Sequence, residues 1–369
     1  MKTILAFLPL LVLLITRCGL NSSFTPSVTE EDWGWQDGKA VKLFTLTNRN
    51  SIVLKVTNYG ATITWISVPD RNGVFEPVVL GFDSLNEYVA VRGGYGSVIG
   101  RYANRIGGAQ FILNGEKYTL TANSRGNTIH GGNKGFNKQV FDIDTSYVKG
   151  DSVKVAFSYL SPDMEEGFPG NLLLKVTYTL TVENEVVIDY EATTDKPTVV
   201  NFTNHAYFNL GGCRGSILDH YLMVVSDSIC EIDIIGLPTG RLLPVAGTAW
   251  DFNYARLVGS RIDAVKPGYD NTYMLRREGD GIIIAAEVYD TVSGRVMEAF
   301  TTEPGMQLYT SNSDRKTIGH DGNEYGRYYG ICLEMQHFPD SPNHPNFPNV
   351  VLDPNETYRQ TTIYKFSTK

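Results

Sequence analysis

Two segments of the chain place a side chain that can transfer protons at the end of an apolar run. His205 lies in VNFTNHAYFNLGG, and an imidazole titrates near neutrality. Glu334 lies in GICLEMQHFPDSPNHP, inside an apolar segment typical of a strand, where desolvation would raise the pKa of its carboxyl and make it a competent base. These residues alone leave structural roles open: a core histidine with satisfied hydrogen bonds, and a buried ion pair between Glu334 and Arg105.

Two further clusters combine polar side chains with glycines, as loops do. GRYANRI and the following NTIHGG supply Arg105, a rigid fork of donors, and His130, which can donate or accept a hydrogen bond. This combination suits an oxygen-rich ligand, although Arg105 could equally form a structural ion pair and His130 fill a turn. GYDN places Asp270 on the rim of a predicted loop, where an aspartate beside glycine is usually a turn former.

The motifs of several other classes of protein are missing from the sequence. The six histidines show no H-x-H or H-E-x-x-H spacing and the four cysteines no C-x-x-C, so we predict neither a metal site nor a disulfide scaffold. For Cys213, Cys230 and Cys332 we expect buried free thiols. No Walker loop, dinucleotide fingerprint or G-x-S-x-G occurs. The net charge of -8, without long charged runs, argues against a nucleic-acid partner.

Strands are the elements that must position these side chains. Apolar and polar residues alternate with a period of two over residues 174–182 and again over 186–192, which predicts a hairpin. Further strands are predicted over residues 42–47, 51–57, 62–68, 153–159, 281–289 and 295–301, whereas only residues 84–89 suggest a turn or two of helix. We therefore expect an all-β protein, one large antiparallel β-sandwich over residues 40–369, with the functional residues on loops and strand ends of a concave face.

The N-terminus has the pattern of an export signal. The apolar run from Ile4 to Thr16 is too short to span a bilayer core of ~30 Å comfortably, but it fits the apolar region of a secretory signal. Cys18 follows this run as in bacterial lipoprotein signals, while Arg17 departs from the small residue that such signals prefer. We expect a signal over residues 1–18, ending in either cleavage or a lipid anchor at Cys18, a tether over residues 19–39 and no transmembrane domain. The predicted location is the periplasm, or the bacterial envelope through that anchor.

Nine motifs, taken in order, resemble those of the aldose 1-epimerase family, the galactose mutarotases. They cover nearly the whole chain after the predicted signal. The motifs are the opening strands (NYGATITWISVPDRNG and VVLGFDSLNEY), GRYANRIGGAQFILNGEKYTL, NTIHGG, SPDMEEGFPGNL, NFTNHAYFNLGG, a run that ends in GTAWDF, GYDNTYML, GMQLYTSN and LEMQHFPDSPNHPNFPNVVLDPNETY.

The resemblance implies a galactose mutarotase-like supersandwich and the interconversion, without a cofactor, of the α and β anomers of a free hexose such as galactose or glucose. Glu334 in the L-E-x-Q motif matches the catalytic base of the family, and His205 in N-H-x-Y-F-N-L matches the catalytic acid. The residues that match those holding sugar hydroxyls are Asn104, Arg105, His130, Asp270 and Gln307.

Anomer exchange explains why these residue types are needed. The C1 hydroxyl loses a proton while the ring oxygen gains one, and a carboxylate and an imidazolium can do both, so that neither a cofactor nor a metal is required. His205 must then be protonated when Glu334 is not. We expect ion pairing between them to favour that state by lowering one pKa and raising the other.

The chain departs from the family pattern after GYD, where Asn271-Thr272 replaces the usual His-Asn, so the support of Asp270 is expected to differ. A non-catalytic carbohydrate-binding protein on the same scaffold would need neither His205 nor Glu334. A glycoside-active enzyme would need two carboxylates ~5–10 Å apart, for which only Asp270 and Glu334 are candidates. The expected partner is a free monosaccharide, and the sequence agrees with a monomer or a dimer.

Overall fold

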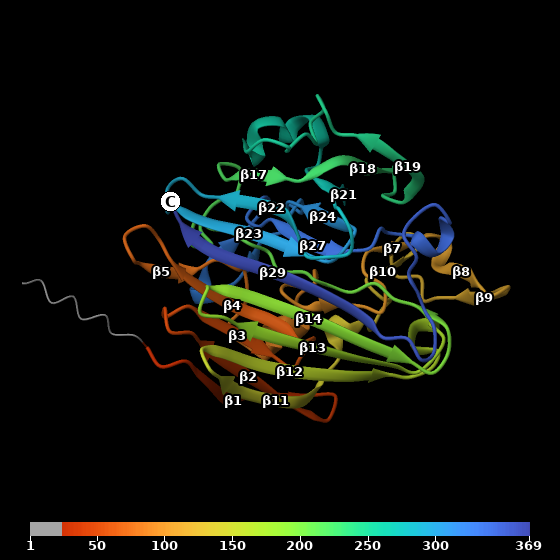
Figure 1. Ribbon diagram of the computed structural model, residues 1–369, viewed down its shortest axis with the longest axis horizontal. Coiled ribbons are helices and arrows are strands. Elements are labelled where there is room, and N and C mark those ends of the chain that lie inside the picture. The colour runs from red at the N-terminus through yellow and green to blue at the C-terminus, as the bar shows by residue number, and fades with distance from the viewer. Residues whose placement is uncertain (1–23) are drawn as a thin grey trace, which may run out of the picture.

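The computed structural model describes residues 24–369 and consists mainly of antiparallel strands (Figure 1). Its largest sheet has nine strands, in the spatial order β11 (Asp142–Lys149), β12 (Ser152–Ser161), β13 (Leu172–Leu180), β14 (Glu185–Thr194), β29 (Tyr358–Thr368), β23 (Arg295–Thr301), β22 (Ile283–Tyr289), β17 (Tyr221–Val224) and β20 (Arg256–Leu257). Two sheets have five strands each. One is β1 (Ser27–Gln36), β2 (Lys39–Thr47), β3 (Val53–Thr57), β4 (Thr62–Pro69) and β5 (Phe75–Pro77). The other is β19 (Pro238–Pro244), β18 (Ser226–Ile232), β21 (Asp270–Leu275), β24 (Gly305–Tyr309) and β27 (Cys332–Gln336).

Short elements connect and cover these sheets. The two-stranded pairs are β6 (Val98–Ile99) with β16 (Thr203–Asn204), β7 (Arg105–Ile106) with β10 (Thr128–Ile129), β8 (Gln110–Leu113) with β9 (Glu116–Thr119), β15 (Thr198–Val199) with β28 (Val351–Leu352), and β25 (Thr317–Ile318) with β26 (Glu324–Tyr325). The helices of residues 24–369 are α1 (Leu85–Ala90) and the 3-10 turns Gly107–Ala109, Phe136–Lys138, Glu165–Gly167, Val258–Val265, His320–Gly322 and Ser341–Asn343.

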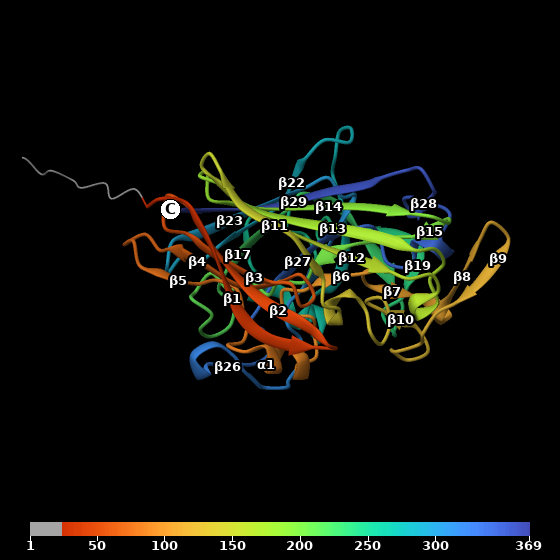
Figure 2. The same cartoon turned by 90° about the horizontal axis from the view of Figure 1, so that it is seen from below.

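One apolar core joins the nine-stranded sheet to both five-stranded sheets. Strand alternation buries Leu172 and Leu174 of β13 completely, whereas Leu173 between them faces outward and is exposed. The same core cluster includes Leu54 of β3 and Leu308 of β24. Figure 2 shows the layers, with β13, β14 and β29 on one side and β2 and β3 on the other. The predicted antiparallel β-sandwich is therefore confirmed.

The sequence pattern located the long strands well. The alternating residues 174–182 and 186–192 correspond to β13 and β14, which pair antiparallel from Leu172 with Thr194 to Leu180 with Val186 as the expected hairpin. The turn or two of helix expected over residues 84–89 is α1.

The predicted tether over residues 19–39 is wrong for its second half. Strand β1 pairs with β2 from Ser27 opposite Thr47 to Gln36 opposite Lys39. Most side chains of β1 are exposed because it is the edge strand of its sheet, so its sequence is polar and lacks a marked apolar period. Trp33 anchors the strand, with its ring 5.6 Å from that of Tyr88.

The features that predicted an export signal, including Cys18, lie in residues 1–23, outside the described residues. In the described range, no helix has the length and apolar character needed to cross a lipid bilayer. The three cysteines of that range, Cys213, Cys230 and Cys332, are buried free thiols, as expected.

Candidate active site

Six of the seven predicted site residues line a single cavity of about 300 Å³. This volume is at the small end of the range for small-molecule sites, roughly 300–1,000 Å³, and suits one small polar ligand. The six residues are Asn104, Arg105, His130, His205, Asp270 and Glu334.

Strand alternation explains why Glu334 faces the cavity. On β27 its neighbours Leu333 and Met335 pack in the core, so the side chain between them points to the opposite face of the sheet. The register places Gln307 of β24 opposite Glu334, and Thr272 of β21 opposite Gln307. These three side chains therefore form a row across the sheet on the cavity side.

The backbone holds His205 at the cavity. His205 directly follows β16, its amide donates to the carbonyl oxygen of Ser97 at 3.0 Å, and its own carbonyl accepts from the amide of Gly96 at 2.9 Å. Gly96 has a φ of 70°, and a Cβ there would lie 2.0 Å from the carbonyl oxygen of Ile63. Only glycine lets the chain pass this close to β4 and still bind His205.

A stack of aromatic rings fixes the plane of the imidazole. The Tyr207 ring stacks on His205 with centroids 5.0 Å apart and planes 23° apart, and Tyr95 stacks on Tyr207 at 4.4 Å. The Tyr207 hydroxyl donates to the carbonyl oxygen of Gly93 at 3.2 Å, which keeps its ring in place. The His130 ring meets His205 edge-on, with centroids 5.4 Å apart.

His205 and Glu334 approach each other without a direct hydrogen bond. His205 Nε2 lies 3.6 Å from Glu334 Oε1, and the residues are 5% and 2% exposed. Burial lowers the pKa of His205 to about 4. Burial, and then the charge of Asp270, raise the pKa of Glu334 well above its usual value, against an opposing effect of Arg105.

The expectation that ion pairing would protonate His205 and ionise Glu334 is therefore wrong for the site without a ligand. At this separation, attraction between the charges does not offset the cost of desolvating both. The pKa directions instead favour a neutral His205 beside a protonated Glu334. Within the described residues, His205 Nδ1 and Glu334 Oε2 have no hydrogen-bond partner, so both groups keep unused hydrogen-bonding capacity.

Asn104 and His130 are held together at one edge of the cavity. The pairing of β7 with β10 places Arg105 opposite Ile129, so Asn104 and His130 flank this pair. The His130 amide donates to the Asn104 carbonyl at 3.0 Å, and the Asn104 amide donates to His130 Nδ1 at 3.3 Å. Because Nδ1 accepts, the proton of the neutral ring is on Nε2, which is then a donor. Burial, followed by the charges of His205 and Arg105, lowers the pKa of His130 well below its usual value, so the ring stays neutral.

Asp270 joins two parts of the site. Arg105 Nη2 lies 3.5 Å from Asp270 Oδ2, and Arg105 Nη1 donates to Asn104 Oδ1 at 3.2 Å. From the other side, Gln307 Nε2 donates to Asp270 Oδ1 at 2.6 Å. Gln307 is only 3% exposed and is the one predicted site residue that does not line the cavity. The carboxylate beside Arg105 is thus Asp270 and not Glu334, which removes the structural explanation that the sequence left open for Glu334.

Comparison with known proteins identifies the family to which this chain belongs. The family model described as aldose 1-epimerase matches residues 42–365. The chain belongs to the aldose 1-epimerase family. The enzyme is therefore an isomerase with the activity of a mutarotase.

Individual relatives match most of the enzyme. It is 40% identical to a galactose mutarotase of Rattus norvegicus over 89% of this chain and 95% of the relative, and 41% identical to the one of Homo sapiens over 85% and 90%. The crystal structure of a galactose 1-epimerase from Lactobacillus acidophilus superposes with a TM-score of 0.83 at 28% identity, covering 93% of this chain and 99% of that one.

The predicted export to a bacterial envelope is wrong. The relatives of rat and man match the enzyme over 89% and 85% of its length, and animal cells have no periplasm. The apolar run and Cys18, which alone carried that prediction, lie outside both the described residues and the range matched by the family model.

The sequence interpretation did not assign two aromatic residues to the cavity: Tyr309, and Tyr207, which was expected only to fix the loop around His205. Tyr309 lies two residues after Gln307 on β24 and therefore on the same face of the strand. Tyr207 lies two residues after His205. A period of two, counted outward from each candidate residue, would have found both.

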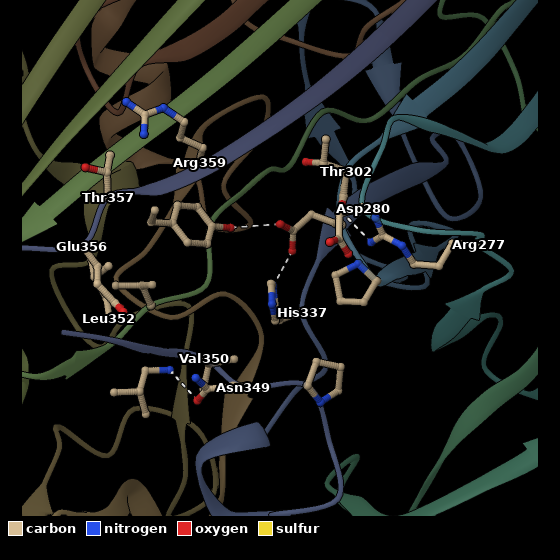
Figure 3. A pocket seen from close by; sticks show the side chains of 16 residues that line it. Arg277, Asp280, Thr302, His337, Asn349, Val350, Leu352, Glu356, Thr357 and Arg359 are labelled. Atoms are coloured by element: carbon tan, nitrogen blue, oxygen red, sulfur yellow. Dashed lines mark hydrogen bonds and ion pairs between the residues drawn. The ribbon is translucent and has the colours of Figure 1, made fainter.

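A larger cavity of about 920 Å³ contains none of the predicted site residues (Figure 3). Its polar centre is His337, whose Nδ1 lies 2.5 Å from Glu303 Oε2, while the Tyr358 hydroxyl donates to Glu303 Oε1 at 3.0 Å. Burial lowers the pKa of His337, but the charge and hydrogen bond of Glu303 outweigh it, so the pKa is raised overall. Among residues 24–369, neither this cavity nor any other place holds a cluster of His, Cys, Asp or Glu suited to a metal ion.

Proposed function

We propose that the enzyme interconverts the α and β anomers of free galactose, and of related hexoses such as glucose, with Glu334 and His205 as its acid–base pair. The observation that carries this proposal is the position of these two groups, 3.6 Å apart in one small polar cavity. Galactose is the sugar named for the relatives of rat and man.

Anomer exchange requires the sugar ring to open and close. Glu334 takes the proton from O1 while the C1–O5 bond breaks and His205 gives a proton to O5, so that C1 and O1 become an aldehyde. After rotation about the C1–C2 bond, O5 attacks the other face of C1. His205 recovers its proton from O5, and Glu334 returns one to O1. Each group ends in its starting state, and no electrons are gained or lost.

Binding of the sugar supplies the protonation state that this sequence of steps needs. The pair holds one proton in both arrangements, on Glu334 in the empty site and on His205 when the reaction starts. Hydrogen bonds from sugar hydroxyls to Glu334 Oε2, which has no partner among the described residues, favour the carboxylate. The face of the Tyr207 ring, stacked on His205, favours the imidazolium. Sugar binding therefore moves the proton from Glu334 to His205, and the Tyr207 ring, which is present with or without the sugar, lowers the cost of that transfer.

The remaining residues of the cavity are suited to hold the other sugar hydroxyls. His130 offers a neutral Nε2–H donor, Arg105 and Asn104 offer further polar groups, and Asp270 offers an acceptor. Gln307 orients Asp270 and retains one amide hydrogen beyond the one it donates. A site with fixed donors and acceptors around a buried acid–base pair aligns O1 and O5 with the groups that exchange their protons.

Polarimetry of freshly dissolved α-galactose tests the proposal. The wild-type enzyme should speed the change in optical rotation, and Glu334→Gln should lose about 10²–10⁴-fold in turnover while binding galactose with similar affinity in calorimetry. A wild-type enzyme that leaves the spontaneous rate unchanged for both galactose and glucose would overturn it. An undiminished rate for Glu334→Gln would reject the role of Glu334 and leave the activity itself standing.

A further inference from the structure

Two residues of this chain, Asn271 and Thr272, lie next to Asp270 at the start of β21, and only one of them faces the site. Asn271 Oδ1 accepts a hydrogen bond from Trp250 Nε1 at 2.8 Å. Thr272 is opposite Gln307 in the register, and its hydroxyl donates to Gln307 Oε1. Thr272 is therefore the member of this pair that belongs to the row leading to Glu334.

A continuous chain of side-chain contacts runs from Thr272 to the wall of the cavity. The Thr272 hydroxyl binds the oxygen of the Gln307 amide, and the nitrogen of the same amide donates to Asp270 Oδ1 at 2.6 Å. Asp270 Oδ2 in turn lies 3.5 Å from Arg105. Thr272 and Gln307 are 2% and 3% exposed, whereas the Asp270 side chain is 38% exposed. The buried end of this chain is fixed, and the exposed end is the group that meets a ligand.

The direction of the Gln307 amide decides what Asp270 meets. With its oxygen toward Thr272, the amide presents its NH2 group to the carboxylate, whereas the reversed amide would present a second oxygen and repel it. Asp270, which only accepts hydrogen bonds, selects the first orientation, and the Thr272 hydroxyl stabilises it by donating to the amide oxygen. Without that hydroxyl, a buried carbonyl oxygen would lose its hydrogen-bond donor, which is unfavourable for a group shielded from water.

We propose that Thr272 is a positioning residue for the sugar site: through Gln307 it orients Asp270 and so sets the affinity for the free sugar. This inference rests on the proposed function, because it takes Asp270 as a group that binds a sugar hydroxyl. Thr272 does not contact His205 or Glu334 by any hydrogen bond of the described residues, so the proton transfers themselves are left unchanged.

The test compares Thr272→Val, which removes the hydroxyl and keeps the shape, with Thr272→Ser, which keeps the hydroxyl. Thr272→Val should raise the KM for galactose about tenfold, the effect expected for an unsatisfied buried acceptor, and change kcat by less than about twofold. Thr272→Ser should restore the KM to within about twofold of the wild-type value. Asn271→Ser is the matched control on the other face of β21, and its KM should stay near that of the wild type.

Three results would overturn the inference: an unchanged KM for Thr272→Val, a loss confined to kcat, or a Thr272→Ser variant as impaired as Thr272→Val. The last two would indicate a general structural role. If Thr272→Val does not fold, Thr272→Cys replaces it, since a thiol is a weak donor of similar size.

Calorimetry with galactose separates this inference from the proposed function. A wild-type enzyme without mutarotase activity would reject the function, yet the affinities of the Thr272 variants for galactose would still test the positioning role.

Discussion

Two His–Glu pairs behave in opposite ways although a member of one, Glu334 in β27, lies only three residues from a member of the other, His337. Glu334 faces His205 at 3.6 Å in the cavity of about 300 Å³, whereas His337 binds Glu303 at 2.5 Å in the cavity of about 920 Å³ (Figure 3). The first pair has no direct hydrogen bond, and burial drives both members toward their neutral forms. In the second, the hydrogen bond and charge of Glu303 hold His337 in its protonated form to a higher pH.

The two pairs differ in how fully their hydrogen-bonding capacity is used, and this difference, rather than cavity size, agrees with the role proposed for the first pair. Glu303 is engaged by both His337 and the Tyr358 hydroxyl, so its oxygens already have donors. Glu334 Oε2 has no partner among the described residues. The His–Glu separation is about one ångström longer in the first pair than in the second. The shorter separation is that of a hydrogen-bonded ion pair, whereas the longer one leaves hydrogen-bonding groups for a ligand.

Replacing the histidine of each pair should give the largest contrast. His205→Gln should lower kcat for galactose by about 10²–10⁴-fold, because the ring oxygen loses its proton donor. His337→Gln should keep kcat within about twofold. Polarimetry at saturating galactose measures both variants. A comparable loss of kcat in His337→Gln would show that the two pairs are not functionally distinct.

Replacing the glutamate of each pair should change the stability of the protein by different amounts. Glu303→Gln should reduce the free energy of unfolding by about 3 kcal/mol, because it breaks the ion pair with His337 and leaves the half-buried imidazole without the partner that stabilises its charged form. Glu334→Gln should cost nothing or stabilise the protein at neutral pH, since it removes a carboxyl whose ionisation burial opposes. Urea unfolding, with the slope m checked for constancy, measures both. The opposite order of stabilities would contradict the assignment of the ion pair.

The pH dependence of activity should reveal the low pKa of His205. On the acid side, kcat/KM should stay level through pH 6.5 and fall only near pH 4, where a second proton enters the pair. The measurement is kcat/KM for galactose from pH 3.5 to 8, with tryptophan fluorescence confirming that the protein remains folded. An acid limb near pH 6.5 would mean that the His205 pKa is not lowered.

The pH dependence of the free energy of unfolding should reveal the raised pKa of His337. The pKa of His337 is raised on folding, so its contribution is complete below the unfolded value of about 6.5 and disappears as pH rises through the folded value. The difference in unfolding free energy between the wild type and His337→Gln should therefore shrink from pH 6 to pH 9. A difference that is constant over this range would point to packing alone.

The smallest effect is expected from replacing Tyr207, whose ring stacks on His205. Tyr207→Leu should lower kcat about fivefold, because the imidazolium loses a favourable aromatic face, while Tyr207→Phe should lose less. The acid limb of the pH profile of kcat/KM should move to lower pH in Tyr207→Leu, because the pKa of His205 in the free enzyme falls further. A fall in kcat without any shift of that limb would indicate misplacement of the ring instead.

The sequence was sufficient for the strands that alternate strictly, such as β13 and β14, because one buried face imposes a period of two. It did not reveal β1, since the edge strand of a sheet needs few apolar residues. Six residues that line the cavity were named from motifs, but the distances between them could not be predicted. Glu334 and His205 are far apart in the sequence, and only the cross-strand register and the paired backbone at Gly96 set the 3.6 Å between them. The direction of their pKa shifts depends on that distance and on burial, so the expected ion pair was wrong.

The place of β29 has a consequence for how the chain folds. Strand β29 fills the position between β14 and β23, so the large sheet is completed by the strand that is synthesised after all of its other strands. From Thr194 to Tyr358 the growing chain carries β14 with one edge unpaired, which at roughly 5–20 residues per second lasts on the order of 10 s. An unpaired edge of this length can pair with another chain. Slow synthesis of the second half should therefore increase the demand for chaperones.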